Sequence, residues 1–170
     1  MPPPAPRAIF AAMDQDRASH RLRTVEIDEA SLAANSRLVE HERKVAIVDL
    51  LEANYFQPEG ADGGPYDLAI ALVDNRLALD VAGPGYQRRL LLSLTPLRGV
   101  IRDYFLLYDS YHKAIQGSSP SQIEAIDMGR RGLHNEGAER LRERLAGKVA
   151  LDHDTARRLF TLICALHRRG

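Results

Sequence analysis

The chain has 170 residues with 23 basic and 23 acidic side chains, so its net charge indicates neither a nucleic acid nor a membrane as its partner. Hydrophobic residues make up 45% of the sequence, which is enough for one sizeable core. The single cysteine, Cys164, excludes an internal disulfide and indicates a reducing compartment. No apolar run approaches the roughly 20 residues of a transmembrane helix. We expect a cytoplasmic protein without a membrane anchor.

Residues 1–19 are rich in proline and alanine and have no apolar period. This composition predicts a disordered tail, followed by a single domain over residues 20–170. Weak alternation from Arg21 to Ile27 predicts the first strand of that domain.

A helix is expected next, because Asn35 and Ser36 can cap its start. It should run to about Tyr55 and bury the apolar residues that recur at helical spacing, which are Leu38, Val45, Val48 and Leu51. The glycines and prolines of residues 58–65 then predict a loop.

The clearest pattern in the chain predicts an antiparallel meander. Asp74 and Asn75 both tolerate positive φ, so they can form a two-residue turn. Folding about this turn places apolar residues in opposed pairs on one face: Leu77 with Leu72, Leu79 with Ile70, and Val81 with Leu68. A third strand, from Tyr86 to Leu94, follows a turn at residues 83–85.

Three further helices are expected. Thr95–Pro96 begins one that should bury Leu97, Ile101, Tyr104, Phe105, Tyr108 and Ile115. Ser119–Pro120 begins a second, which continues towards Gly147, and residues 148–151 form a short strand. Asp152 or Asp154 caps the last helix, with Ala156, Leu159, Phe160, Ile163 and Leu166 on its core face. The fold class is therefore α+β, an antiparallel β-meander packed against four or so α-helices in one domain.

Three glycines interrupt the second of these helices, and each costs about 1 kcal/mol in a helix interior relative to alanine. The helix breaks there, or the glycines admit another backbone or a ligand. A basic Gly-x-x-Gly loop between two helices is how KH domains clamp a nucleic-acid backbone, although a KH domain has an apolar residue where this chain has Asn135. The segment predicts a binding surface for RNA or a protein, formed by Gly129, Arg130, Arg131, Gly132, His134 and Asn135.

A continuous helix would instead align one polar stripe, formed by Glu124, Asp127, Arg131 and His134. Asp127, Arg131 and His134 could then perform general acid–base chemistry in a small hydrolase. Ordinary ion pairs between helical neighbours explain the same pattern, and no nucleophile or metal-ligand set accompanies it. Arg130 and His134 are too close in sequence to match the arginine–histidine pair of HEPN ribonucleases.

The remaining reactive side chains favour structural roles. Residues 40–43, Glu-His-Glu-Arg, lack the second histidine of a His-Glu-x-x-His metal site, and His41 is expected to be partly buried beside Val45 and Val48. Cys164 should pack in the core of the last helix. Tyr104, Tyr108 and Tyr111 are expected to be core or interface aromatics. We therefore expect no metal and no cofactor.

Four segments carry a resemblance to a known family: Glu40–Leu51, Ser93–Pro96, Ser121–Gly137 and Asp154–Cys164. Together they make the chain after the tail similar to the alphaproteobacterial uncharacterised protein family UPF0262. The resemblance implies a bacterial, cytoplasmic protein of unassigned function, and it supplies no catalytic residue or cofactor.

These observations favour a non-catalytic binding or regulatory protein whose contact surface includes Arg130 to Asn135. A small hydrolase using Asp127, Arg131 and His134 is the main alternative, and a structural homo-oligomer is a third. The oligomeric state stays open.

Overall fold

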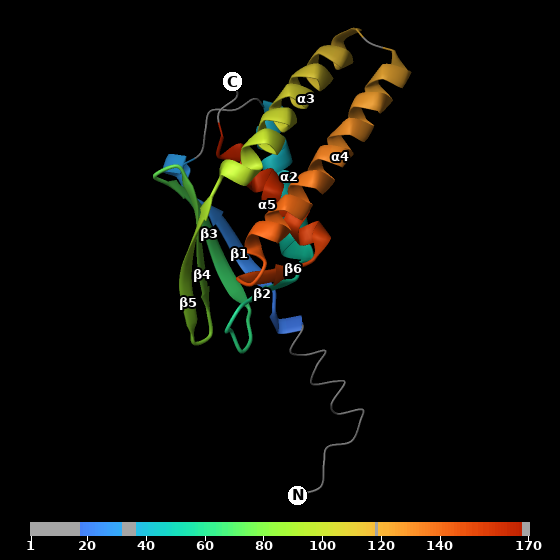
Figure 1. The fold of residues 1–170 in the computed structure, drawn as a ribbon. Coiled ribbons are helices and arrows are strands. Elements are labelled where there is room, and N and C mark those ends of the chain that lie inside the picture. The colour runs from blue at the N-terminus through green and yellow to red at the C-terminus, as the bar shows by residue number, and fades with distance from the viewer. Residues whose placement is uncertain (1–17, 32–36, 118, 168–170) are drawn as a thin grey trace, which may run out of the picture.

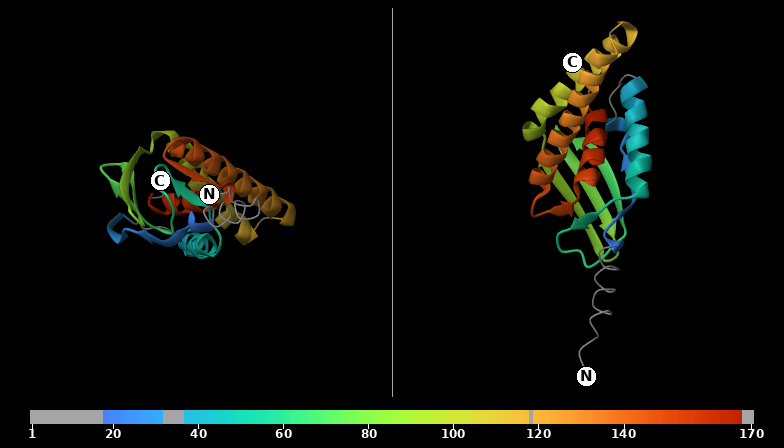
Figure 2. Two further views of the ribbon diagram at one scale, coloured as in Figure 1. Left: turned by 90° about the horizontal axis from the view of Figure 1, so that it is seen from below. Right: turned by 90° about the vertical axis from the view of Figure 1, so that its right-hand side faces the viewer.

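Four helices cover one face of a four-stranded sheet in the computed structural model, which describes residues 18–31, 37–117 and 119–167 (Figures 1 and 2). The strands lie in the order β1-β3-β4-β5. Their bounds are Leu22–Ile27 for β1, Tyr66–Val73 for β3, Arg76–Gly83 for β4 and Tyr86–Ser93 for β5. The α+β class predicted from the sequence is confirmed. Most of the predicted tail, residues 1–17, lies outside the described residues.

The antiparallel meander is confirmed in its register. Asp74 and Asn75 adopt φ values of 51° and 61°, as a two-residue hairpin turn requires. Leu79 lies opposite Ile70, and the other two predicted pairs are also present. β5 then pairs antiparallel with β4, with Leu90 opposite Leu79. Turn chemistry and apolar alternation agree here, so the local sequence is enough to set the register.

β1 forms as predicted, but it pairs parallel with β3, with Val25 beside Leu68. Between these strands the chain forms α2 (Arg37–Glu52) and β2 (Phe56–Pro58), which together make the crossover that a parallel pair needs. A short 3-10 helix, η1 (Glu29–Ser31), follows β1. Alternation predicts a strand but not its direction, so the meander is only part of the sheet.

The other helices follow the meander. The short 3-10 helix η2 (Thr95–Leu97) leads into α3 (Arg98–Gly117), so Thr95–Pro96 starts this segment, although Leu94 holds the cap position and no side chain caps it. α4 (Pro120–Leu145) is capped by Ser119, whose Oγ accepts a hydrogen bond from Gln122 N. β6 (Val149–Leu151) pairs antiparallel with β2 in a second, two-stranded sheet.

α5 (His153–Ala165) lies in the middle of the helical layer, in contact with both α2 and α4. Asp152 caps it, because its Oδ1 accepts a hydrogen bond from Thr155 N at 2.9 Å. The predicted core face is buried, and so is Cys164. α2 and α4 thus pack against α5, and α3 packs against α4.

The predicted apolar face of α2 was wrong for all of its residues except Leu38, and that of α3 was wrong only at Ile115. α2 buries Val39, Ala46 and Leu50, whereas Val45 and Val48 are 41% and 59% exposed. Both sets recur at helical spacing, so the spacing alone does not select one. α2 packs against α5 and β1 through Val39, Ala46 and Leu50. His41, expected to be partly buried, is exposed for the same reason.

In α3 the predicted core face holds from Leu97 to Tyr108, but Ile115 is 58% exposed and Ala114 is buried. The end of α3 and the start of α4 project beyond the sheet as a helical hairpin (Figure 1). There α3 has only α4 to pack against, so the buried face rotates. Tyr104 and Tyr108 are core residues as predicted, and Tyr111 is half-buried.

α4 runs without a break through all three glycines, so of the two alternatives that the sequence left open the continuous helix is present and the Gly-x-x-Gly loop is not. A Cβ atom placed on Gly129 would lie 3.6 Å from the side chain of Leu107, an ordinary packing distance, whereas Gly132 faces open space. Gly137 packs directly against the ring of Phe160. A close helix crossing at Gly137 therefore explains one glycine, and the loss of helix propensity at the other two is offset by packing along a helix of 26 residues.

No helix within the described residues is both long and apolar enough to span a bilayer.

Candidate functional site

A cleft of about 480 Å³ opens where α2, α4 and α5 meet. We call it the arginine cleft, since four arginines and only two carboxylates line it. Its walls are formed by Glu42, Val45, Ala46 and Asp49 of α2, by Arg130, Arg131, His134 and Asn135 of α4, and by Arg157, Arg158 and Thr161 of α5. Among the lining side chains positive charges therefore outnumber negative ones, which favours anions, and Asp127 offsets part of this excess at Arg130 and Arg131.

Arg130 ties α4 to α2 at one side of this cleft. Its Nη1 donates to Glu42 Oε1 at 2.9 Å, and its Nη2 donates to Asp127 Oδ1 at 2.9 Å. Hydrogen bonds from Arg130, with the charges of Arg130 and Arg131, hold the pKa of Asp127 below its usual range. The Arg130 side chain is 29% exposed, so this ion pair is partly shielded from water. Arg130 is chiefly a bridge between two helices.

The other arginines have donors to spare. Arg131 pairs with Asp127 Oδ2 at 3.1 Å, yet its side chain is 73% exposed. Arg157 approaches Asp154 only to 3.6 Å, and its buried Nε has no hydrogen-bond partner among the described residues. Arg158 donates to the carbonyl of Ala53. Arg131 and Arg157 can thus donate to a ligand without giving up a strong bond.

Below these arginines lies a buried cluster of aromatic polar side chains. The ring of His134 stacks on Tyr104 with centroids 5.7 Å apart, and Tyr104 is 4.4 Å from the ring of Tyr108. His134 Nε2 is buried and has no hydrogen-bond partner within the described residues, whereas the Tyr108 hydroxyl interacts with Tyr104 and Arg130. Most buried polar atoms in proteins are hydrogen-bonded. Of this cluster, His134 also lines the arginine cleft, so a ligand bound there can supply its missing partner.

Burial and nearby charge control which forms of these groups are present. Burial, with the charges of Arg130 and Arg157, lowers the pKa of His134 to about 4. Burial and the Glu42 charge raise the pKa of Tyr108 to about 12, and burial raises that of Tyr104 further. At neutral pH the cluster therefore consists of a neutral imidazole and two protonated phenols.

The structure brings together only part of the predicted binding surface. Arg130, Arg131, His134 and Asn135 all line the arginine cleft. Gly129 and Gly132 do not, and as residues inside a helix they cannot present the free N–H groups of a phosphate-clamping loop. Asn135 is also tied to the start of α5, because its Oδ1 lies 3.0 Å from His153 Nε2.

The proposed catalytic residues are close in sequence, but they do not form a connected set. Asp127 pairs with Arg131, as ordinary helical neighbours do. Among the described residues, no hydrogen bond joins His134 to either of them. The stripe therefore divides into an ion pair on the surface and a histidine in the core.

Reasoning from the sequence missed the residues that other helices supply. The sequence singled out Glu42 only as part of an incomplete metal motif, and it did not single out Arg157. One signal for Arg157 was available, since Arg157 and Arg158 interrupt an otherwise apolar helix. No signal in the sequence indicated that Tyr104 and Tyr108 would lie beneath His134.

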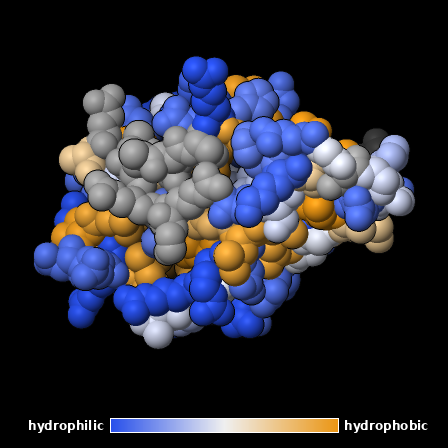
Figure 3. All heavy atoms as spheres, turned by 90° about the horizontal axis from the view of Figure 1, so that it is seen from above, coloured by the Kyte–Doolittle hydropathy of each residue, from blue (hydrophilic) through white to orange (hydrophobic). Residues whose placement is uncertain are grey.

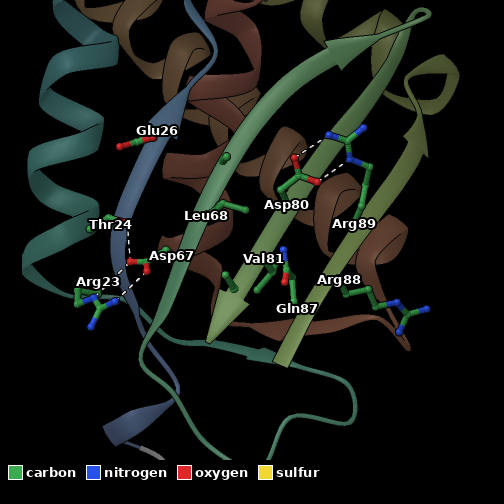
Figure 4. Close-up of a pocket in the computed structure, with 12 residues that line it drawn as sticks. Arg23, Thr24, Glu26, Asp67, Leu68, Asp80, Val81, Gln87, Arg88 and Arg89 are labelled. Carbon is green, nitrogen blue, oxygen red and sulfur yellow. Dashed lines mark hydrogen bonds and ion pairs between the residues drawn. The ribbon is translucent and has the colours of Figure 1, made fainter. Parts of the chain in front are cut away.

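A second hollow, of about 690 Å³, lies on the uncovered face of the sheet. Figure 4 shows Arg23 and Thr24 converging on Asp67, and Arg89 forming two hydrogen bonds with Asp80. These pairs satisfy one another, and each is about half exposed. Exposed ion pairs of this type contribute little and are common on solvated sheets. This hollow is a weaker candidate than the arginine cleft.

Large apolar side chains are also exposed on the helices. Val48 on α2 and Leu106, Ile115 and Met128 on the α3–α4 hairpin are each more than half exposed. Figure 3 shows apolar atoms beside hydrophilic ones on the face seen from above. Exposed apolar atoms are ordinary on protein surfaces, so the arginine cleft is the stronger candidate.

The fold and the site define a class of small α+β protein. A layer of helices covers one face of the sheet, and this layer contains an arginine-rich cleft beside buried aromatic side chains. The chain belongs to the uncharacterised protein family UPF0262, whose family model matches residues 19–169. This confirms the resemblance seen in the sequence.

The relatives that match are similar along nearly their whole length. A UPF0262 protein of Caulobacter vibrioides is 68% identical over 91% of this chain and 97% of its own. One of Phenylobacterium zucineum is 66% identical over 92% and 99%, and one of Brucella suis is 54% identical over 93% and 100%. No solved structure matches this chain.

Proposed function

We propose that this protein is a non-catalytic binding protein that takes up an anionic group of its partner in the arginine cleft. The observation that supports this most is the combination of four arginines against two carboxylates with buried polar atoms that have no partner within the described residues. We also propose that it acts in the cytoplasm, because its one cysteine, Cys164, is a free thiol.

If RNA is the partner, it does not bind through a Gly-x-x-Gly loop. The loop that would have clamped an RNA backbone is a helix, and Arg130 is engaged with Glu42 and Asp127. An RNA or a protein partner would therefore have to insert a single phosphate or carboxylate between α2, α4 and α5. The hydrolase alternative has less support, because His134 and Asp127 are not joined and a pKa near 4 makes His134 a weak base.

Chemical-shift mapping by NMR tests the proposal. Inorganic phosphate, acetate and a short single-stranded RNA would be titrated separately into the ¹⁵N-labelled protein. We expect the backbone signals around Arg131, His134 and Arg157 to move with at least one probe. Arg157→Gln should weaken this binding several-fold, since it removes an unpartnered donor. Arg88→Gln, on the open sheet face, is the matched control and should bind as the wild type does.

Each probe decides a different part of the proposal. Shifts at the cleft with phosphate alone indicate a small phosphorylated ligand, and shifts with RNA that Arg157→Gln abolishes indicate an RNA phosphate. If none of the three probes moves the cleft signals at millimolar concentration, or if Arg157→Gln binds as tightly as the wild type, the proposal is wrong.

A further inference from the structure

His134 occupies an unusual position for a titratable side chain. It is 8% exposed, it lies at the base of the arginine cleft, and its Nε2 has no partner among the described residues. Its ring stacks on Tyr104 and makes an edge contact with Phe160, whose ring centroid is 6.5 Å away. The ring is thus fixed in place, while its hydrogen-bonding capacity is not used.

The titratable and charged groups around His134 come from all four helices. Cations predominate near it, which together with burial is why its pKa lies near 4. The titratable and charged groups that face the cleft or its aromatic base are Glu42 and Asp49 of α2, Tyr104 and Tyr108 of α3, Asp127, Arg130 and Arg131 of α4, and Arg157, Arg158 and Cys164 of α5. Without an anion, His134 is therefore kept neutral.

We propose that the arginine cleft binds a tetrahedral oxyanion, of the phosphate or sulfate type, and that binding is coupled to uptake of one proton by His134. This inference rests on the proposed function, because it names the ligand class and the regulation of the same site. The proton comes from solvent and converts the neutral imidazole to imidazolium. No covalent bond of the ligand forms or breaks.

The charge balance explains the coupling. An anion held by Arg131 and Arg157 offsets the positive charges of Arg130 and Arg157, which disfavour a charged His134. The imidazolium can then donate a hydrogen bond to the anion, and a charge-assisted bond of this kind is about twice as strong as a neutral one. Linkage requires the reverse effect as well, so a lower pH must tighten anion binding.

A tetrahedral oxyanion fits the donors better than a carboxylate does. The buried Nε of Arg157 has no described partner, and Arg131 is mostly exposed. These two arginines belong to different helices and line the cleft together with His134. Four oxygens arranged around a centre can accept from all three, whereas the two oxygens of a carboxylate lie in one plane.

Isothermal titration calorimetry with sulfate tests the coupling, since sulfate remains a dianion across the pH range used. Titrations at pH 5.5 and pH 7.5, each in two buffers of different ionisation enthalpy, report the protons taken up. If the ligand restores His134 to its ordinary pKa, we expect nearly one proton per sulfate at pH 5.5 and affinity up to about tenfold higher than at pH 7.5.

Two further measurements keep the test independent of any single variant. The NMR titration midpoint of the His134 imidazole in the wild type should rise when sulfate is added. His134→Asn should bind sulfate without proton uptake, whereas His41→Asn, an exposed histidine outside the cleft, should keep it.

The outcomes separate the two proposals. Sulfate binding at the cleft with no proton uptake, and with an unchanged His134 midpoint, overturns the coupling and leaves the binding function standing. Failure of both sulfate and phosphate to bind at either pH overturns the oxyanion assignment, and a response of the cleft to acetate or RNA alone would then still support the broader function.

Discussion

A Cβ atom placed on Gly137 of α4 would lie 2.6 Å from Cγ of Phe160 on α5, well inside van der Waals contact. The backbone of α4 therefore rests directly on an aromatic ring of the central helix. This contact holds α4 close to α5, and so it sets the position of His134 one turn earlier in the same helix.

The two glycines at 137 and 132 should respond to alanine in opposite ways. Gly137→Ala should lower the free energy of unfolding by about 1–3 kcal/mol, because the methyl group overpacks against Phe160. Gly132→Ala should raise it by up to about 1 kcal/mol, since the position is exposed and alanine favours the helix. Urea unfolding followed by circular dichroism measures both. Changes of the same sign would mean that Phe160 does not restrict Gly137.

The meander predicts that alanine substitutions at neighbouring residues of β4 lower the free energy of unfolding by very different amounts. Leu79 is 3% exposed opposite Ile70, so Leu79→Ala should cost about 2–5 kcal/mol. Asp80 faces the open side and pairs with Arg89, so Asp80→Ala should cost at most about 1 kcal/mol. Denaturant unfolding of the two variants tests this. Equal losses would show that both faces of the sheet are covered.

The two adjacent arginines of α4 should also contribute unequally to the free energy of unfolding. Arg130 bridges Glu42 and Asp127 in a partly buried position, so Arg130→Ala should destabilise the protein by about 1–3 kcal/mol. Arg131 is 73% exposed, and Arg131→Ala should cost less than about 0.5 kcal/mol.

A double-mutant cycle with Glu42→Gln isolates the contact between α2 and α4. We expect a coupling energy above about 0.5 kcal/mol between positions 42 and 130, measured by thermal or urea unfolding. Additive effects would indicate that the ion pair does not join the helices in solution.

Acid should destabilise the fold through His134. Its pKa is lowered to about 4 from 6.5, so the unfolded chain binds a proton that the folded protein does not. Stability contributed by the neutral imidazole is present above pH 6.5 and is lost as the pH falls from there towards 4. Between pH 7.5 and pH 5 the wild type should lose roughly 2 kcal/mol more than His134→Gln.

Urea unfolding of both proteins at pH 7.5, 6 and 5, without added anions, measures this difference. The pKa of His167 is also lowered by burial, but this residue is present in both proteins and its effect cancels. Parallel pH profiles would mean that His134 is not held neutral by its surroundings.

Local chemistry was enough to predict the parts of the fold in which neighbours in sequence are neighbours in space. The turn at Asp74–Asn75 and the alternation on either side of it act over a few residues, and they determine the register of β3 and β4. The caps at Ser119 and Asp152 are local in the same sense.

The choice between two possible apolar faces was not local. In α2, Val45 and Val48 share one helical spacing, and Ala46 and Leu50 share another, so periodicity alone supports both. Packing against α5 and β1 selected the second set. The glycines of α4 are a similar case, because intrinsic propensity argues against a continuous helix and the contact of Gly137 with Phe160 outweighs it.

The sequence by itself determined the α+β class and the meander, and it predicted a binding surface that includes four polar residues of α4. Only the tertiary structure decided that this surface is an arginine cleft, because Glu42 lies 88 positions before Arg130, and Arg157 comes from a third helix. Side-chain spacing along one helix specifies which residues share a face. What that face meets depends on how separate helices pack, and no periodicity within a single segment encodes it.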